Sequence, residues 1–452
     1  MTINKTMSSS SQSPDMTPFA EPLWHTRPTE VYYNESHRRL RDTIRAYISE
    51  KITTNCAEWE EQGFVPKDVL LEHSRRGYTA VTVNPAAIAP YMGNIKLPGG
   101  IRPDQWDAFH DLVCIDEIAR CGYLGVILAL GCGDAIGLPP VINFGTEAQK
   151  KEFLPKVIKG QSRFCLAVTE VEAGSDVANI TTTAVRKGDV YVVNGAKKWI
   201  TNGIWATHCT AAVRTGGPGK GGISALVISL TSKGVSRRKI LNSGVAASGS
   251  TYIEFDDVEV PVTNLLGKEN QGFKIIMSNF NHERLWLACT SLRMARVCLQ
   301  DAYSYALSRH TFGKALINHQ AIRTKFSLMA GSILPAHAFM ESLVALSNTL
   351  PSSNTNSRST PVATEQVQIG GLIALLKVTA ARALEQAVRE AQQVMGGLGY
   401  SRTGKGARIE QISRDMRVMV VGGGSEEILT ELAFAQEGKD VAVIAGRVQS
   451  KL

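Results

Sequence analysis

The 452-residue sequence predicts an α+β fold in which helices come first, strands follow and helices return. Three observations support this order. Apolar residues recur every three or four positions in the first third, β-branched residues and turn signals dominate residues 165–268, and the helical spacing resumes after Gly272. We therefore expect a helical domain at 33–164, a β domain at 165–268 and a second helical domain at 269–440.

The first third contains three segments with the apolar spacing of amphipathic helices. They span residues 35–52, 106–119 and 147–158. Thr146 is the expected N-cap of the third helix, because its hydroxyl can accept a hydrogen bond from a free backbone N–H. Pro155 is expected to kink or end the same helix.

The middle third has the patterns of strands. An Asn-Gly pair at 194–195 separates two short β-prone runs, at 190–193 and 196–200. Because Asn-Gly readily adopts the positive φ angles of a tight turn, this arrangement predicts a β-hairpin. Further strands are predicted at 224–230 and 251–260.

Helical spacing returns in the last third. An apolar stripe runs over residues 285–306, and further helices are predicted at 320–347, 364–394 and 425–436. The segment 347–361 is rich in Ser, Thr and Asn and contains two prolines, which predicts an exposed loop between helices.

The composition narrows the class of protein. The net charge is +8 and the isoelectric point is about 9.0, but the basic residues are spread along the chain without a Lys/Arg run. We therefore expect a solvated surface and no nucleic-acid partner. No unbroken apolar stretch reaches about 18 residues, so no membrane span is expected.

The cysteines point to neither disulfides nor a metal. None of the eight belongs to a C-x-x-C pair, and several lie in apolar segments. We expect buried free thiols and no metal site. The eight are Cys56, Cys114, Cys121, Cys132, Cys165, Cys209, Cys289 and Cys298.

Both ends of the chain are expected to be tails. Residues 1–32 begin with a stretch rich in Ser, Thr and Pro, which predicts a disordered segment. Residues 441–452 end in Ser450-Lys451-Leu452, a C-terminal peroxisomal address, so we expect a peroxisomal protein.

Five local motifs follow one another along the chain. Each alone would be weak, but together and in this order they resemble the motifs of the acyl-CoA dehydrogenase family over about residues 33–440. The motifs are V-T-E-V-E-A-G-S-D-V at 168–177, N-G-A-K-K-W-I-T-N at 194–202, R-H-T-F-G-K at 309–314 followed by His319-Gln320, Q-V-M-G-G-L-G-Y at 393–400, and R-D at 414–415 followed by G-G-S at 423–425.

The resemblance implies an architecture and a cofactor. The fold would consist of an α-helical N-terminal domain, a β-barrel middle domain and a C-terminal four-helix bundle. The cofactor would be FAD, and the assembly would be a homotetramer built from two dimers.

The flat isoalloxazine ring of FAD needs a surface to stack on and donors for its polar edge. Trp199 would form that surface, although alone it would be taken for a core aromatic side chain, and Thr201 would donate to the N5–O4 side. Arg309 and the loop that begins at Gln393 would reach the FAD of a neighbouring subunit. The residues implied at FAD are Leu166, Val168, Thr169, Gly174, Ser175, Trp199, Ile200, Thr201, Arg309, Thr311, Phe312, Gln320, Gln393, Gly396, Gly397, Ser425 and Glu427.

Dehydrogenation of a thioester needs a base for the α proton. In many members of the family a glutamate precedes the terminal G-T pair, but here that position is Gly423 and the preceding tyrosine position is Gly422. A minority of members with branched or longer substrates takes the glutamate from the start of a helix in the C-terminal domain, and Glu283 matches that site. Glu426 and Glu427 are the alternatives.

Without the resemblance, Glu283 would be taken for an acidic residue favoured by a helix N-terminus. Three residues are implied at the substrate: Ser175, Arg284, which could instead form a surface ion pair, and Gly423, whose N–H could donate to the thioester carbonyl. Because the run 422–424 is all glycine, it lacks the bulk that the family often has there. We therefore expect a medium, long or branched acyl chain.

The resemblance thus implies an acyl-CoA dehydrogenase that removes the α proton with Glu283 and passes the β hydride to flavin N5. The substrate is expected to be an acyl-CoA, with a carrier-protein thioester left open. The electron acceptor would be an electron-transferring flavoprotein or O2, the latter giving an oxidase. A nitroalkane-oxidising or monooxygenase flavoenzyme of the same fold is an alternative, and a non-catalytic DNA-binding relative is one of another class.

Overall fold

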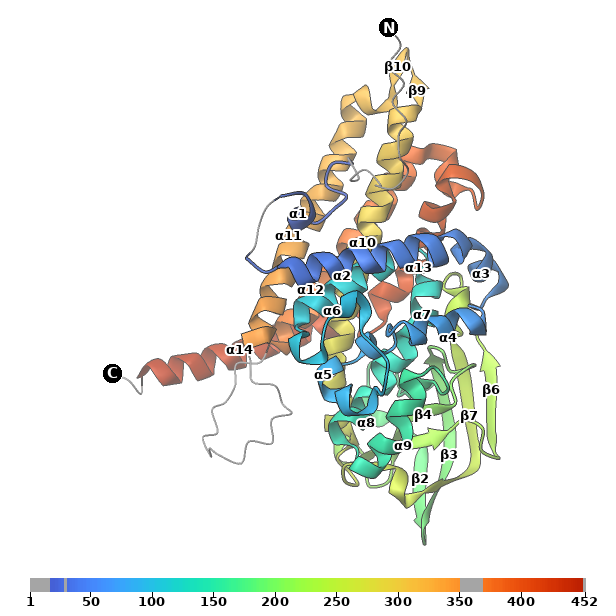
Figure 1. Cartoon of the computed structure of the whole chain (residues 1–452). Coiled ribbons are helices and arrows are strands. Elements are labelled where there is room, and N and C mark those ends of the chain that lie inside the picture. Colours follow the sequence, from blue (N-terminus) through green and yellow to red (C-terminus); the bar gives the residue numbers. More distant parts are fainter. Residues whose placement is uncertain (1–16, 28–30, 350–368, 450–452) are drawn as a thin grey trace.

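The computed structural model describes residues 17–27, 31–349 and 369–449, and it has a helical first part, a sheet and a long helical bundle (Figure 1). The predicted order of helices, strands and helices is confirmed. The helices of the first part are α1 Leu23–Thr26, α2 Glu35–Tyr47, α3 Cys56–Gln62, α4 Lys67–Arg75, α5 Pro85–Ile88, α6 Ala108–Ala119, α7 Leu124–Gly137, α8 Pro139–Phe144 and α9 Glu147–Ile158.

The three helices predicted in this part are confirmed as α2, which ends earlier than expected, α6, which begins later, and α9, which has the expected ends. Thr146 caps α9 as expected, since its hydroxyl accepts the N–H of Gln149. The helix does not end at Pro155, because α9 continues to Ile158. Val157 and Ile158 are fully buried, and their packing stabilises the turn that follows the proline.

The sheet of the middle part is mixed and does not close into a barrel, which corrects the expected β-barrel. Its order is β6-β7-β3-β2-β4-β5-β8, and β1 pairs in parallel with β4. The edge strand β6 reads V-S-R-R-K, and such charged edges resist further pairing. The strands are β1 Phe164–Ala167, β2 Thr183–Lys187, β3 Val190–Ile200, β4 His208–Arg214, β5 Ile223–Ser229, β6 Val235–Lys239, β7 Thr251–Pro261 and β8 Leu265–Leu266.

The hairpin predicted at Asn194-Gly195 is wrong, because β3 runs unbroken through both residues. Asn194 instead exchanges two hydrogen bonds with Asp257 of β7, at 2.8 and 3.0 Å. A Cβ at Gly195 would lie 2.7 Å from the Cα of Thr182, so glycine is needed for a close approach of two strands. The tight turn lies at Gly188, between β2 and β3, where φ is 62°.

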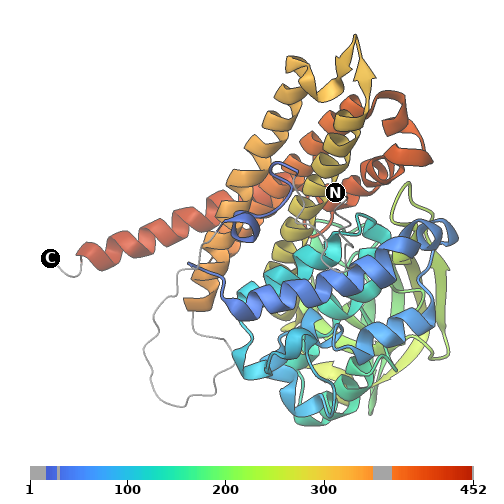
Figure 2. The same ribbon diagram turned by 45° about the horizontal axis from the view of Figure 1, so that its top comes forward.

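The last part is a four-helix bundle of α10 Gly272–Ser308, α11 Gln320–Thr349, α12 Gly370–Met395 and α13 Ala407–Val421. A small hairpin of β9 His310–Thr311 and β10 Lys314–Ala315 joins α10 to α11. The final helix, α14 Glu426–Gln449, extends away from the bundle (Figure 2).

Several expected boundaries differ in this part. The α11 helix continues to Thr349, and the rest of the expected 347–361 loop lies outside the described residues. The start of the expected helix at 364 also lies outside them. The expected tail 441–452 is wrong as far as Gln449, because α14 includes these residues.

The expected disordered tail 1–32 is wrong for Thr17–Arg27, which fold back onto α10. Arg296 donates to the carbonyl oxygens of Phe19 and Glu21 at 2.8 and 3.2 Å. The Glu21 carboxylate accepts from Arg293 at 3.1 Å, and Arg293 also pairs with Asp116 of α6. This segment therefore joins the first helical part to the bundle through buried charges.

The cysteines and two long apolar stretches contribute to the interior of the protein. All eight cysteines are buried and free, as predicted. The stretches Leu124–Phe144 and Gln320–Thr349 are long and apolar enough to cross a membrane by composition alone. The most apolar window of the first is 89% buried inside the protein, so this stretch has the character of a core helix. The most apolar window of the second is 44% buried, and its helix packs against α10 and α12.

Candidate active site

Glu283 lies on α10, about three turns after the helix begins at Gly272. The expected position at a helix start is therefore wrong, and the helix dipole does not account for a carboxylate there. A Cβ added at Gly423 would lie 3.8 Å from Oε1 of Glu283. The structure thus brings together the two positions at which members of the family would carry the base, and in this chain only Glu283 has a carboxylate there.

The environment of Glu283 favours a proton acceptor. Burial raises its pKa to about 7, although the charges of Arg284 and Lys377 oppose this rise. A carboxylate with a pKa near neutrality is matched to general base catalysis at physiological pH.

A loop of three glycines, residues 422–424, lies beside Glu283. Arg284 donates from Nε to the carbonyl oxygen of Gly423 at 3.0 Å. Gly423 has φ of 68°, and a Cβ there would lie 2.7 Å from Cδ1 of Leu287. The backbone conformation therefore favours glycine, and a larger residue would also require the Leu287 side chain to move.

An apolar cluster connects Glu283 to the predicted flavin strand. Leu166 and Val168 are buried in this cluster together with Ile276, and Met277 and Phe280 of α10 pack against it. Phe280 precedes Glu283 by nearly one helical turn. The helix that carries the predicted base therefore packs against the V-T-E motif through this cluster.

Trp199 has the properties of a wall for a flat ligand. It has φ of 65°, lies at an irregularity in the pairing of β3 with β7, and keeps 53% of its surface exposed. Asn202 fixes the following turn, because its side chain accepts the N–H of Gly133 and donates to the Ser248 carbonyl. A large aromatic ring held outward by a strained backbone, with Thr201 beside it, fits the stacking and edge contacts that FAD requires.

The V-T-E and W-I-T motifs are joined by a buried ion pair that the sequence did not predict. Lys197 is fully buried and donates to Oε1 of Glu170 at 2.7 Å and to the Val168 carbonyl at 2.9 Å. Burial would raise the pKa of Glu170, but Lys197 and donors from Thr181 and Thr182 lower it to about 2. Burial lowers the pKa of Lys197 against the pull of Glu170, yet the short contact and the additional donors favour the ionised pair.

The other implied residues near this region occupy varied positions. Gly174 and Ser175 are exposed on the turn after β1, and the Thr169 carbonyl accepts the N–H of Lys198. Ile200 is buried. Ser425 directly precedes α14, and its carbonyl accepts the N–H of Leu429.

The alternative bases are less suited than Glu283. Glu426 forms an ion pair with Arg382, whose hydrogen bond lowers the pKa of the carboxyl. Glu427 is exposed in the first turn of α14. Acidic residues at these positions are stabilised by the helix N-terminus and need no catalytic role.

Seven implied FAD residues lie at the far end of the bundle, where β9 and β10 are seen in Figure 1. From Glu283 to the end of α10 at Ser308 the helix spans about 38 Å. The chain does not bring these residues to its own Trp199. They are Arg309, Thr311, Phe312, Gln320, Gln393, Gly396 and Gly397.

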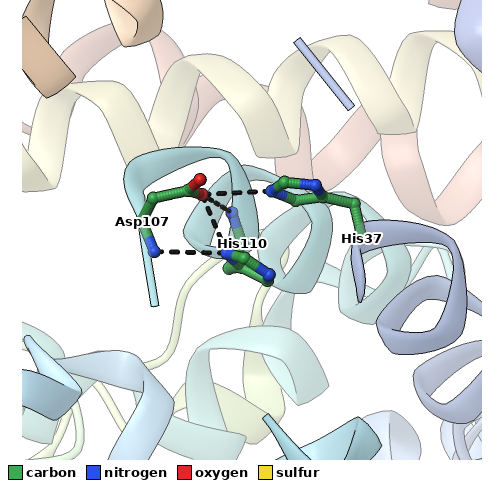
Figure 3. Close-up of side chains that lie close together, drawn as sticks. All are labelled: His37, Asp107 and His110. Carbon is green, nitrogen blue, oxygen red and sulfur yellow. Dashed lines mark hydrogen bonds and ion pairs between the residues drawn. The ribbon is translucent and has the colours of Figure 1, made fainter. Parts of the chain in front are cut away.

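A separate group of potential metal ligands, His37, Asp107 and His110, serves to link two helix starts (Figure 3). Each histidine accepts its own N-cap amide through Nδ1, Asn34 N–H for His37 and Asp107 N–H for His110. The Asp107 carboxylate accepts from Nε2 of His37 at 3.1 Å and caps α6. The two rings are stacked at 3.9 Å, so their nitrogen lone pairs do not converge on one ion.

We expect Asp107→Ala to destabilise the protein by about 1–2 kcal/mol, because it removes an N-cap and the acceptor of His37. Burial lowers the pKa of His110 from its ordinary value of 6.5, against the pull of Asp107. Folding therefore favours neutral His110, and the contribution of this histidine to the free energy of unfolding is lost as pH falls below about 6.5.

Urea denaturation of wild type and Asp107→Ala at pH 7.5 and 5.5 would measure both effects. Asp104→Ala is the matched control, since Asp104 is an exposed carboxylate three residues earlier that pairs with Arg102. Equal midpoints for the two variants would show that the linked caps contribute nothing.

The R-D motif is structural as well. Asp415 is buried and accepts the N–H groups of Leu124, at the start of α7, and of Val245. A polar cavity of about 310 Å³ lies next to it, between α3, the 242–246 loop and α13. None of the residues that line this cavity belongs to the Glu283 surroundings.

Comparisons with known proteins agree with this geometry. Three family models match in succession: acyl-CoA dehydrogenase N-terminal domain at 34–161, middle domain at 165–258 and C-terminal domain at 270–436. Acyl-CoA dehydrogenase AFT10-1 of Alternaria alternata is 54% identical over 94% of this chain and 96% of its own length. Acyl-CoA dehydrogenase apdG of Emericella nidulans is 39% identical over 93% and 94%. The crystal structure of a probable acyl CoA dehydrogenase from Mycobacterium abscessus superposes with a TM-score of 0.77 at 33% identity, covering 89% of this chain and 99% of the other.

Proposed function

This chain belongs to the acyl-CoA dehydrogenase family, which makes it an FAD-dependent oxidoreductase of acyl-CoA thioesters, and we propose that Glu283 is its catalytic base. The observation that carries this proposal is the position of the Glu283 carboxylate beside Gly423. It is supported by the pKa of Glu283, which burial raises to about 7.

Bound FAD supplies the acceptor for the hydride that leaves the β carbon. Glu283 takes the α proton, so that one C–H bond breaks at each carbon and a double bond forms between them. The N–H of Gly423 donates to the thioester carbonyl, which becomes more negative as the proton leaves. Arg284, bonded to the Gly423 carbonyl at 3.0 Å, fixes the orientation of that peptide.

The proposed substrate is a medium, long or branched acyl-CoA. The support is the absence of side chains at 422–424, directly beside the proposed base. A panel of acyl-CoA thioesters added without oxygen would test this through loss of the visible flavin absorbance. We expect branched or longer chains to reduce the flavin faster than a straight four-carbon chain, and equal or faster reduction by the four-carbon chain would contradict the proposal.

The proposed assembly is a homotetramer of two dimers. The support is the distance between the implied FAD contacts of the bundle end and Trp199 of the same chain, together with the exposure of Phe312, 96% of its surface, and Tyr400, 88%. Light scattering on the purified protein tests the assembly, and a stable monomer that keeps its FAD would exclude it.

The proposed location is the peroxisome, on the basis of the C-terminal S-K-L, which lies outside the described residues. A fluorescent fusion that keeps the last three residues should enter peroxisomes, and one without them should not.

The electron acceptor can be identified by testing whether reduced enzyme is reoxidised by an electron-transferring flavoprotein or by O2 with release of peroxide. Nothing among the described residues favours the nitroalkane, monooxygenase or DNA-binding alternatives.

A further inference from the structure

Lys377 is a buried lysine in the first third of α12, and no motif in the sequence indicates a role for it. Its neighbours Leu376 and Val378 belong to the core, and Lys377 itself is 1% exposed. A lysine is almost never buried to this extent unless its charge is bonded. The contacts of its ammonium group therefore indicate what the charge does.

The ammonium group holds both ends of the glycine loop. Nζ of Lys377 donates to the carbonyl oxygen of Val420, in the last turn of α13, at 2.7 Å and to that of Gly424 at 3.0 Å. A cation at a helix C-terminus is stabilised by carbonyl groups that have no partner within the helix. Lys377 thus fixes the loop on the side of α12, while Arg284 fixes Gly423 on the side of α10.

The same charge acts on Glu283. The positive charges that act on Glu283 are those of Arg284 on the same helix and, to a lesser extent, Lys377 of α12, and Glu283 in turn acts on the Cys132 thiol of α7. Those that face Lys377 are Glu283, Arg284 and Glu426 of α14. Glu426 is already paired with Arg382, and Arg284 is bonded to the loop. Arg284 and Lys377 both bond loop carbonyls, and among the ion pairs that the described residues form neither of them is paired with a carboxylate.

We propose that Lys377 is a positioning residue for the reaction: it clamps the 422–424 loop beside Glu283 and supplies the countercharge that favours the carboxylate form of this base. The proposal rests on the proposed function of Glu283. If Lys377 lost its charge, Arg284 would still favour the carboxylate, but Glu283 would keep its proton to a higher pH and would accept the α proton less readily.

Two substitutions test this inference. Lys377→Met removes the charge and the donors at similar length, and Lys377→Gln removes the charge but keeps an amide donor for the loop. Lys274→Met, at an exposed lysine of α10, is the matched control. The first readout is an infrared difference titration of the Glu283 carboxyl, with Glu283→Gln as reference, which needs no turnover. The second is the pH dependence of anaerobic flavin reduction by an acyl-CoA.

We expect the midpoint of the Glu283 titration to rise by about one pH unit in both Lys377 variants. The ascending limb of the rate profile should move by the same amount, and Lys274→Met should change neither. A Lys377 variant that folds, retains FAD and titrates like wild type would overturn the proposal. So would failure of both variants to fold, since Lys377 would then have only a structural role.

The result is separable from the proposed function. If wild type is not reduced by any thioester, the proposed reaction fails, whereas the infrared titration still decides whether Lys377 controls Glu283. If wild type is reduced and Glu283→Gln is not, but the Lys377 variants keep the wild-type midpoint, the inference fails alone.

Discussion

Glu283→Gln should lower the rate of flavin reduction by an acyl-CoA by about 10³-fold while leaving FAD bound. Glutamine has the shape of glutamate but cannot accept the α proton, so the loss measures the base alone. Because burial raises the pKa of Glu283 to about 7, the wild-type rate should increase as pH rises through 7 and level off above it. Stopped-flow reduction across this pH range would record both effects.

Although Glu283→Gln should lower the rate of flavin reduction, it should raise the stability of the protein at high pH. Folding raises the pKa of the Glu283 carboxyl from about 4.5 to about 7, so the folded state favours the protonated form. The free energy of unfolding therefore decreases as pH rises above 4.5 and through 7. Glu283→Gln should therefore have a higher Tm than wild type at pH 8. Glu431→Gln, at an exposed position of α14, is the control for both measurements. A Glu283→Gln enzyme with near wild-type rates would assign the proton transfer to another group.

Lys197→Met should destabilise the middle domain by about 3–5 kcal/mol and release FAD. The substitution leaves the Glu170 carboxylate buried without its cation, next to the strand that begins the flavin motif. It also removes the donor to the Val168 carbonyl, which lies within that motif. Guanidinium denaturation, and the ratio of flavin to protein after gel filtration, would measure the two losses.

Two companion variants separate charge from packing. In Glu170→Gln/Lys197→Met no charge remains unpaired, and the amide oxygen can still accept from Thr182, so the double variant should be more stable than Lys197→Met alone. Lys198→Met removes only a cation 4.9 Å from the Trp199 ring and should cost less than about 1 kcal/mol. If Lys198→Met and Lys197→Met were equally destabilised, the buried pair would not be the link between the two motifs.

Local patterns in the sequence predicted those elements that depend on local physics. The apolar spacing located α2, α6 and α9, and the hydroxyl of Thr146 occupies the predicted N-cap. The glycine at 423, where the family often has a glutamate, predicted Glu283 as the base, and the two positions are neighbours in the structure. Such features are predictable because each is set by residues close in sequence or by a motif of known arrangement.

The features that escaped prediction depend on distant partners. Asn194-Gly195 has turn chemistry, but Asp257 on a neighbouring strand and the close approach to Thr182 hold it in a strand. Lys377 reads as one polar residue in a helix, and only the position of α13 reveals that it bonds two carbonyls. The ion pair joins Lys197 and Glu170, which are 27 residues apart in the sequence, and no periodic pattern in the sequence indicates such a pair.

The contact between the N-terminal segment and α10 can form only late in the synthesis of the protein. Phe19 is bonded to Arg296 across 277 residues of chain, so this contact cannot form until most of the protein has left the ribosome. At about 5–20 residues per second, the segment waits about 15–60 s for its partner. During that interval Glu21 and the cations that later surround it are solvated rather than buried. Attachment of Thr17–Arg27 is thus a late event that requires α10 to be complete as far as Arg296.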